Sequence, residues 1–122
     1  MKVLIIEDSP TCADAMRTII SANRDGLEYD IAGNLADGIK KVIEGEYNLV
    51  LLDLRLPDSL DPETTLNAFG DYMRHVPTVI VSGAVDVDTG LQAIELGAKG
   101  FVLKSEPCRL VPMIDQAISK GS

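Results

Sequence analysis

The sequence predicts an α/β fold, with a central parallel sheet covered by helices on both faces. Short apolar runs alternate with segments of helical periodicity along the chain, and the connections between them are short. The runs at 3–6, 49–52 and 78–81 lack apolar–polar alternation, as expected for strands buried on both faces. Such an arrangement favours parallel strands joined by right-handed crossovers.

Size and charge limit the classes of function. The chain has 122 residues, which predicts one domain over 1–122. Its net charge of −8 makes direct binding of nucleic acid or an anionic membrane unfavourable. No apolar run approaches the roughly 20 residues of a membrane span, and acids interrupt the first run too early for a signal peptide. We therefore expect a cytoplasmic protein, with Cys12 and Cys108 as buried thiols in a reducing compartment.

The first half of the chain predicts two strand–helix units. A strand over 2–6 is followed by Ser9-Pro10, a good N-cap and first helical residue. Residues 27–32 alternate between apolar and polar, which predicts a strand with one wet face. Asn34 caps a helix that ends at Gly45. The apolar face predicted for that helix is Leu35, Ile39, Val42 and Ile43.

The second half predicts three more units. The strand at 49–52 leads into an acidic loop, and Asp61-Pro62 begins a helix of poor propensity that runs to about Met73. The strand at 78–81 ends at Ser82-Gly83. The helix after it is predicted to have Asp86 or Asp88 as cap and to carry Leu91, Ile94 and Leu96. A last strand, 100–103, ends at Lys104, and Pro107 begins a final helix.

The polarity of the strands predicts their order. The three runs without alternation belong inside the sheet, whereas the alternating run at 27–32 belongs at an edge. The order 2-1-3-4-5 satisfies both conditions. In that order the chain reverses direction between strands one and three, and ligands of open α/β sheets bind at such a point.

Chemically active side chains follow four of the five strands. Glu7 and Asp8 follow the first, Asp53 the third, Ser82 the fourth and Lys104 the fifth. Parallel strands place these ends on one edge, where two carboxylates about 4 Å apart repel by about 4 kcal/mol at an effective dielectric near 20. A cation such as Mg²⁺ would relieve this repulsion.

Lys104 and Ser82 are not needed to hold a metal, but they suit a phosphoryl group beside it. A carboxylate such as Asp53 can accept that group covalently. The alternative is that the acids cap the helices that follow them, as Asp8 could.

Four segments carry a resemblance to a known family: the pair Glu7-Asp8, residues 51–57, Ser82-Gly83-Ala84, and residues 100–104. Over essentially its whole length, the chain resembles the CheY-like receiver domains of two-component response regulators. These domains have a flavodoxin-like, doubly wound five-stranded sheet and are a known example of the order 2-1-3-4-5.

The resemblance implies a phosphorylation switch. Asp53 would take a phosphoryl group from the phosphohistidine of a sensor histidine kinase or a histidine phosphotransfer protein. Lys104 would pair with the phosphoryl oxygens and Ser82 would move toward them. The switch aromatic would be Phe101, for which the alternative is an ordinary core side chain of an edge strand. The implied ligands of Mg²⁺ are Glu7, Asp8, Asp53 and the backbone carbonyl of Arg55.

The resemblance also implies where the signal leaves the domain and where the chain departs from the family. A partner would read the surface of the fourth helix, fifth strand and fifth helix, and a phosphorylation-dependent homodimer would use the same surface. Lys104 is followed by Ser105 instead of the usual proline, as in receivers joined to DNA-binding domains, which suggests excision from a longer transcriptional regulator. The loop 57–62 lacks the usual glycine, so we expect an atypical loop, and the small Ala84 leaves the site open near the phosphate.

These observations indicate a signalling switch and not an enzyme, with chemistry limited to its own phosphorylation and dephosphorylation. One alternative is a receiver-like interaction module that is never phosphorylated, although such a module needs none of the acids, Ser82 or Lys104. Another is a Mg²⁺ phosphohydrolase. That enzyme would need a general acid near Asp53 and a substrate cap, for which 122 residues leave no room.

Overall fold

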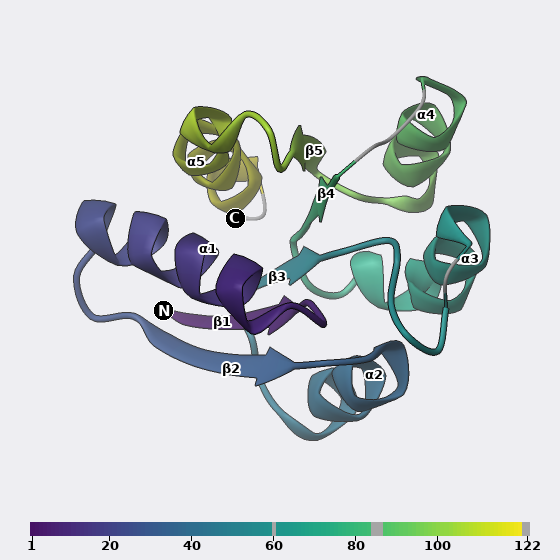
Figure 1. Ribbon diagram of the computed structural model, residues 1–122, viewed down its shortest axis with the longest axis horizontal. Coiled ribbons are helices and arrows are strands. Elements are labelled where there is room, and N and C mark those ends of the chain that lie inside the picture. The colour runs from purple at the N-terminus through teal and green to yellow at the C-terminus, as the bar shows by residue number, and fades with distance from the viewer. Residues whose placement is uncertain (60, 84–86, 121–122) are drawn as a thin grey trace.

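A five-stranded parallel sheet forms the centre of the computed structural model, which describes residues 1–59, 61–83 and 87–120 (Figure 1). Every pairing is parallel and the order is β2-β1-β3-β4-β5, which confirms the predicted α/β class and strand order. The strands are β1 (Lys2–Ile6), β2 (Glu28–Ala32), β3 (Leu49–Leu52), β4 (Thr78–Ser82) and β5 (Gly100–Leu103).

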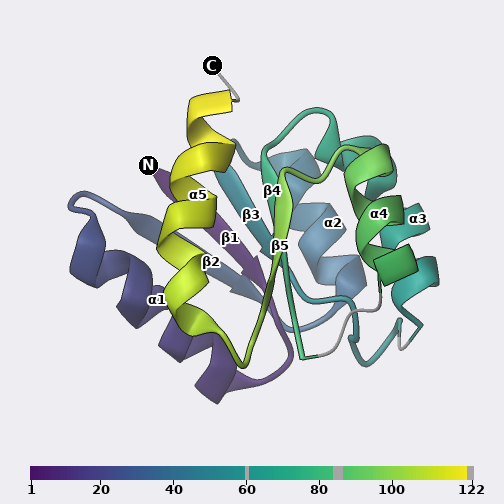
Figure 2. The same cartoon turned by 90° about the horizontal axis from the view of Figure 1, so that it is seen from above.

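Helices cover both faces of the sheet, two on one side and three on the other (Figures 1 and 2). One face carries α1 (Pro10–Asn23) and α5 (Leu110–Lys120). The other carries α2 (Leu35–Glu44), α3 (Pro62–Met73) and α4 (Val87–Leu96). A short 3₁₀ turn, η1 (Pro107–Arg109), precedes α5, so the final helix begins three residues later than predicted. Among the described residues, no helix is long and apolar enough to cross a membrane.

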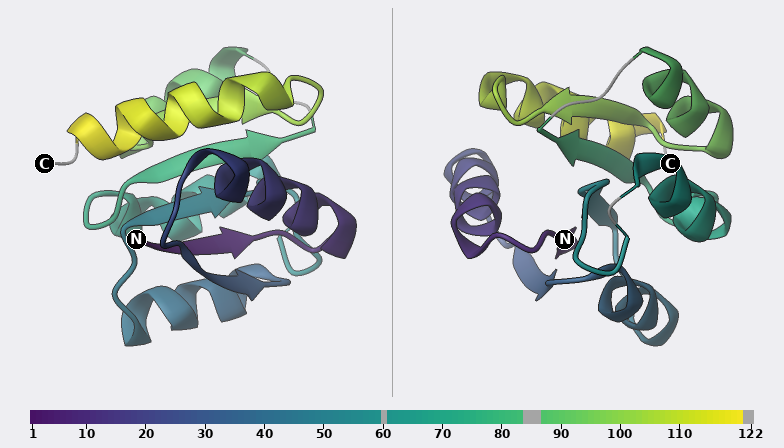
Figure 3. Two further views of the ribbon diagram at one scale, coloured as in Figure 1. Left: turned by 90° about the vertical axis from the view of Figure 1, so that its left-hand side faces the viewer. Right: turned by 45° about the vertical axis from the view of Figure 1, so that its right-hand side comes forward.

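Two hydrophobic layers fill the space between the sheet and its helices. Alternate side chains of β1 point to opposite faces, with Val3 and Ile5 under α1 and α5, and Leu4 and Ile6 under the other three helices. Figure 3 shows α1 and α5 lying side by side across one face of the sheet. Strands β3 and β4 are buried along their whole length and β1 is buried from Val3 to Ile6, as their lack of alternation predicted.

Most of the predicted helix starts are confirmed by side-chain caps. Ser9 accepts the N–H of Cys12 (3.3 Å), so Ser9 and not Asp8 caps α1. Asn34 accepts the N–H of Asp37 (2.7 Å) at the start of α2. Asp61 precedes Pro62 and caps α3. At α4, Asp88 lies inside the first turn, and the other predicted cap, Asp86, lies outside the described residues.

Two apolar helix faces are only partly covered, and the expectation that the cysteines are buried was wrong. Ile43 on α2 and Leu91 and Ile94 on α4 follow a helical apolar pattern, yet all three are exposed. Cys12 is half-buried and Cys108 is exposed, so neither is the buried thiol that we expected. Periodicity shows that a helix has an apolar side, but it does not show whether the molecule covers that side completely.

Candidate functional site

Backbone hydrogen bonds bring the predicted site residues to one edge of the sheet. The N–H of Asp53 donates to the carbonyl of Ile6 (3.0 Å), which ties the end of β3 to the end of β1. The N–H of Lys104 donates to the carbonyl of Ser82 (2.8 Å), which ties the end of β5 to the end of β4. The pairing of neighbouring strands therefore sets the positions of these side chains.

Three carboxylates meet at this edge. Glu7, Asp8 and Asp53 each offer an oxygen, and these three oxygens lie within 4.8 Å of one another. Glu7 and Asp53 are almost fully buried, at 2% and 5% exposure, whereas Asp8 faces solvent. Because two of these acids have little access to water, their mutual repulsion is only weakly screened.

Lys104 is a counter-charge shared by the two buried acids. Its Nζ lies 2.7 Å from Glu7 Oε2 and 3.2 Å from Asp53 Oδ2. The contact with Asp53 is a hydrogen bond, whereas the contact with Glu7 is close but lies outside hydrogen-bond geometry. One ammonium against three carboxylates leaves the fully ionised cluster with a charge of −2, which a divalent cation would neutralise.

The pKa values reflect this crowding. Burial raises the pKa of Glu7 to about 7, and neighbouring Asp53 adds to the rise while Lys104 opposes it. Burial alone would lower the pKa of Lys104, but the contacts with Glu7 and Asp53 outweigh it and the pKa is raised. Lys104 therefore stays charged at neutral pH, and the raised pKa means that Glu7 binds a proton more readily than an ordinary glutamate does.

Backbone N–H groups hold the two buried carboxylates in place. Ser9 donates to Glu7 Oε1 (3.1 Å), and Arg55 donates to Asp53 Oδ1 (3.2 Å). The second contact places the backbone of Arg55, whose carbonyl is the remaining predicted metal ligand, directly beside Asp53. Carboxylate and carbonyl oxygens with access to water are the donor set that Mg²⁺ prefers, so these residues fit that ion.

Ser82 has an unusual environment. It is 1% exposed, and within the described part of the chain its Oγ has no hydrogen-bond partner. A buried hydroxyl without a partner costs about 1–3 kcal/mol, so its presence needs an explanation outside stability.

Phe101 lies on β5, the edge strand that pairs with β4. Its ring is 37% exposed and packs against Gly90 of α4, where an added Cβ would lie 2.8 Å from Cε1 of the ring. Gly90 therefore provides the space that the ring occupies. Phe101 belongs to neither of the two hydrophobic layers, which disagrees with the alternative of an ordinary core aromatic.

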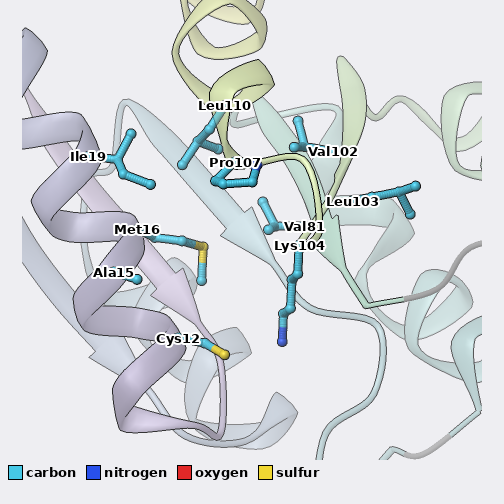
Figure 4. Close-up of a pocket in the computed structure, with 10 residues that line it drawn as sticks. All are labelled: Cys12, Ala15, Met16, Ile19, Val81, Val102, Leu103, Lys104, Pro107 and Leu110. Carbon is cyan, nitrogen blue, oxygen red and sulfur yellow. The ribbon is translucent and has the colours of Figure 1, made fainter.

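An apolar pocket of about 90 Å³ borders the acidic edge on the side of α1 and α5 (Figure 4). Met16 and Ile19 of α1 line one wall, while Val102 and Leu110 line the other. Lys104 is the one charged side chain among the described lining residues, and in Figure 4 its amino group ends level with the side chain of Cys12. The rest of the described lining is largely apolar, so the pocket offers few polar groups to a charged ligand.

Sequence reasoning missed two residues that shape the loop after Asp53. The carboxylate of Asp58 accepts the N–H groups of Leu35 (2.8 Å) and Ala36 (3.0 Å) at the start of α2. The hydroxyl of Thr65, fully buried in α3, lies within hydrogen-bond distance of three carbonyls of the loop. A turn-forming Pro57-Asp58 pair was visible in the sequence, but its partners 22 and 23 residues away were not.

The fold and the site together define an α/β domain with an acidic edge whose carboxylates could hold a divalent ion. The family model of the response regulator receiver domain matches residues 3–115. The chain belongs to this family, the receiver domains of two-component response regulators.

Curated relatives agree. The regulatory protein LuxO of Vibrio cholerae is 31% identical over 121 residues, which are 97% of this chain and 26% of LuxO. The probable C4-dicarboxylate response regulator DctR of Bacillus subtilis is 32% identical over 119 residues, 98% of this chain and 51% of DctR. The chain therefore spans between about a quarter and a half of the length of these two relatives.

Solved structures show the same fold. A receiver domain of a putative LuxO repressor from Vibrio parahaemolyticus has a TM-score of 0.83 at 22% identity, covering 98% of this chain and 90% of that one. A CheY-like receiver domain from Methanospirillum hungatei has a TM-score of 0.82 at 22% identity, covering 98% and 94%.

Proposed function

We propose that this receiver domain is a phosphorylation switch in which Asp53 accepts a phosphoryl group in a Mg²⁺-dependent reaction. The observation that carries the proposal is the buried carboxylate of Asp53, which shares a carboxylate cluster with Glu7 and Asp8 and receives a hydrogen bond from Lys104. The donor is the phosphohistidine of a sensor histidine kinase or a histidine phosphotransfer protein, as the family implies.

The transfer conserves atoms and charge. A carboxylate oxygen of Asp53 forms a bond to phosphorus while the bond between phosphorus and the donor imidazole nitrogen breaks, and that nitrogen takes up a proton. Water later attacks the acyl phosphate, which returns Asp53 to a carboxylate and releases inorganic phosphate. The domain's own catalysis is limited to these two steps, so it acts as a switch and not as an enzyme on other substrates.

Each site residue has a role set by its contacts. Glu7, Asp8, Asp53 and the carbonyl of Arg55 would hold Mg²⁺, which neutralises the incoming phosphoryl oxygens when it is bound. Lys104 already contacts Asp53, so it is in place to form an ion pair with a phosphoryl group there. Ser82 would gain the acceptor that its buried hydroxyl lacks among the described residues.

The output surface is α4, β5 and α5. Val87, Leu91 and Ile94 expose apolar side chains on α4, next to the partly exposed ring of Phe101. Phosphorylation adds about −1.5 to −2 charge, which attracts Ser82 and frees space for Phe101 to move inward. A partner domain or a second phosphorylated copy would then read the altered surface. We infer that the parent is a longer transcriptional regulator, because Ser105 replaces the usual proline after Lys104 and because LuxO and DctR are named as regulators. We also infer a cytoplasmic location, as the family implies.

The test is intact mass after incubation with acetyl phosphate and Mg²⁺. We expect wild type to gain one phosphoryl group, and we expect Asp53→Asn to gain none, because an amide is a poor nucleophile toward phosphorus. A wild type without an adduct would overturn the proposal in favour of an interaction module that is never phosphorylated. An adduct that persists in Asp53→Asn would place the acceptor at another residue.

A further inference from the structure

The loop after Asp53 closes in a tight turn that projects one carboxylate outward. Leu56 and Ser59 exchange two backbone hydrogen bonds, of 3.0 and 2.9 Å, with Pro57 and Asp58 at the exposed corner. No described non-glycine residue has a positive φ, so this turn forms without the glycine that the family usually has. The expected atypical loop is therefore a regular turn with an acid at its tip.

That acid reaches the start of a different helix. Asp58 Oδ1 accepts the N–H of Leu35 (2.8 Å) and Oδ2 accepts the N–H of Ala36 (3.0 Å), the first two residues of α2. A carboxylate is favoured there by the helix dipole and by the unpaired N–H groups of the first turn. These two contacts lower the pKa of Asp58, in agreement with a charge-assisted contact.

Asp58 adds to a cap that α2 already has. Asn34 accepts the N–H of Asp37 and provides the local N-cap of the helix. Helix α2 would therefore keep a cap without Asp58, whereas the link between α2 and the loop after β3 would lose both of its charge-assisted hydrogen bonds.

The inner side of the same loop is fixed by α3. Thr65 Oγ1 lies 2.8 Å from the carbonyl of Leu54 and 3.1 Å from that of Ser59, and 2.6 Å from the hydroxyl of Ser59. Leu54 and Leu56 are fully buried beneath the loop. Arg55 is the one residue between these two buried leucines, and its N–H donates to Asp53 Oδ1.

We propose that Asp58 is a positioning residue for the cation site. By fastening the loop to α2, it holds the Arg55 backbone beside Asp53, so that a Mg²⁺ ligand is in place before the ion arrives. This inference rests on the proposed function, because it concerns the same Mg²⁺ site. Removal of the link leaves all of the ligands present but frees the loop that carries one of them.

The variants Asp58→Ala and Asp58→Asn test the proposal against Asp61→Asn. Asp61 lies in the same connection and caps α3 locally through Glu63 and Thr64, so Asp61→Asn removes a nearby charge, keeps an oxygen acceptor at the cap and leaves the link to α2 untouched. The readouts are Mg²⁺ affinity by calorimetric titration, melting temperature, and amide hydrogen exchange at Leu35 and Ala36 without the ion.

We expect Asp58→Ala to weaken Mg²⁺ binding about tenfold and to speed exchange at both amides. Asp58→Asn should lie between wild type and Asp58→Ala, because an amide oxygen still accepts one N–H but carries no charge. Asp61→Asn should change Mg²⁺ affinity by less than about twofold, with little change in melting temperature because asparagine also caps a helix.

Three outcomes separate the claims. Faster exchange in Asp58→Ala with unchanged Mg²⁺ affinity would overturn the inference and reduce Asp58 to a helix cap. Equal weakening in Asp58→Asn and Asp61→Asn would also overturn it, because long-range charge would then explain the loss. A wild type that binds no Mg²⁺ would overturn this inference and the Mg²⁺ part of the proposed function together.

Discussion

The two sides of the acidic edge differ in how completely their polar groups are paired. On one side, the loop after β3 has its buried hydroxyl, Thr65, against three carbonyls and its exposed acid, Asp58, on two amides. On the other, the equally buried hydroxyl of Ser82 has no partner among the described residues, and the ring of Phe101 is partly exposed.

The difference matches what each side has to do. An acceptor and its cation need a fixed geometry, because positioning supplies most of the catalysis in phosphoryl transfer. In the proposed function, a response element needs two states of similar free energy, and the unpaired hydroxyl of Ser82 and the partly exposed Phe101 are the groups whose states a phosphoryl group would bias. The fixed side lies between α2 and α3, whereas the responsive side lies at β4, β5 and α4 (Figure 2).

The largest loss of stability should come from Thr65→Val. Ser82→Ala is its matched comparison, because both variants replace a buried hydroxyl by an apolar group. Thr65→Val leaves the carbonyls of Leu54 and Ser59 without their buried donor, so we expect a loss of about 1–3 kcal/mol in the free energy of unfolding. Ser82→Ala removes a buried hydroxyl that has no partner, so we expect the free energy of unfolding to stay the same or to rise, by at most about 1–3 kcal/mol.

Urea denaturation of the unphosphorylated protein measures both changes. A substantial destabilisation by Ser82→Ala would show that its hydroxyl is already paired, and the contrast between the two sides would fail. After phosphorylation, we expect wild type to be more stable than Ser82→Ala. Wild type gains a charge-assisted hydrogen bond of about 1.5–3 kcal/mol that Ser82→Ala cannot form.

The fixed side was harder to predict from sequence than the strands were. The runs at 49–52 and 78–81, and the acids and lysine at the strand ends, follow from local composition and from the geometry of parallel sheets. The caps Ser9, Asn34 and Asp61 are equally local. The contact of Asp58 with α2 is not, because a turn acid has many amides within reach and the packing of two distant segments selects one pair.

The responsive side was hidden for a different reason. Gly90 lowers the helix propensity of its segment. Nothing in the sequence of α4 shows that the ring of Phe101 from β5 fills the space beside this glycine. The exposure of Leu91 and Ile94 was hidden in the same way, since their spacing is that of a core face. Both features depend on tertiary packing.

Gly90→Ala should have a smaller effect on the free energy of unfolding. It tests whether the space beside Gly90 holds the ring of Phe101 in place. Alanine gains about 1 kcal/mol of helix propensity, but its Cβ would lie 2.8 Å from the ring and must displace it. We expect the two terms to cancel in part, with a new position of the ring visible in aromatic NMR signals.

Phe101→Ala provides the matched background for this test. With the ring removed, Gly90→Ala should stabilise the domain by about 1 kcal/mol in urea denaturation, because only the helix propensity remains. An equal effect of Gly90→Ala with and without the ring would show that Gly90 does not hold Phe101 in its outward position.

The smallest expected effect is the pH dependence of the link between Asp58 and α2. The hydrogen bonds from Leu35 and Ala36 lower the pKa of Asp58 below its ordinary value of 3.8. Because the folded state favours the charged form, the carboxylate stabilises the fold fully above that ordinary value, and the contribution disappears as pH falls through the folded pKa. The difference in unfolding free energy between wild type and Asp58→Asn should therefore be constant from pH 7 to pH 5 and shrink toward pH 2.

Thr65→Val is the control for this pH dependence. It changes no titratable group, so its cost in unfolding free energy should stay the same over that range. A difference for Asp58→Asn that is equally flat would mean that the charge of Asp58 adds nothing to the link, and that its two contacts with α2 act as neutral hydrogen bonds.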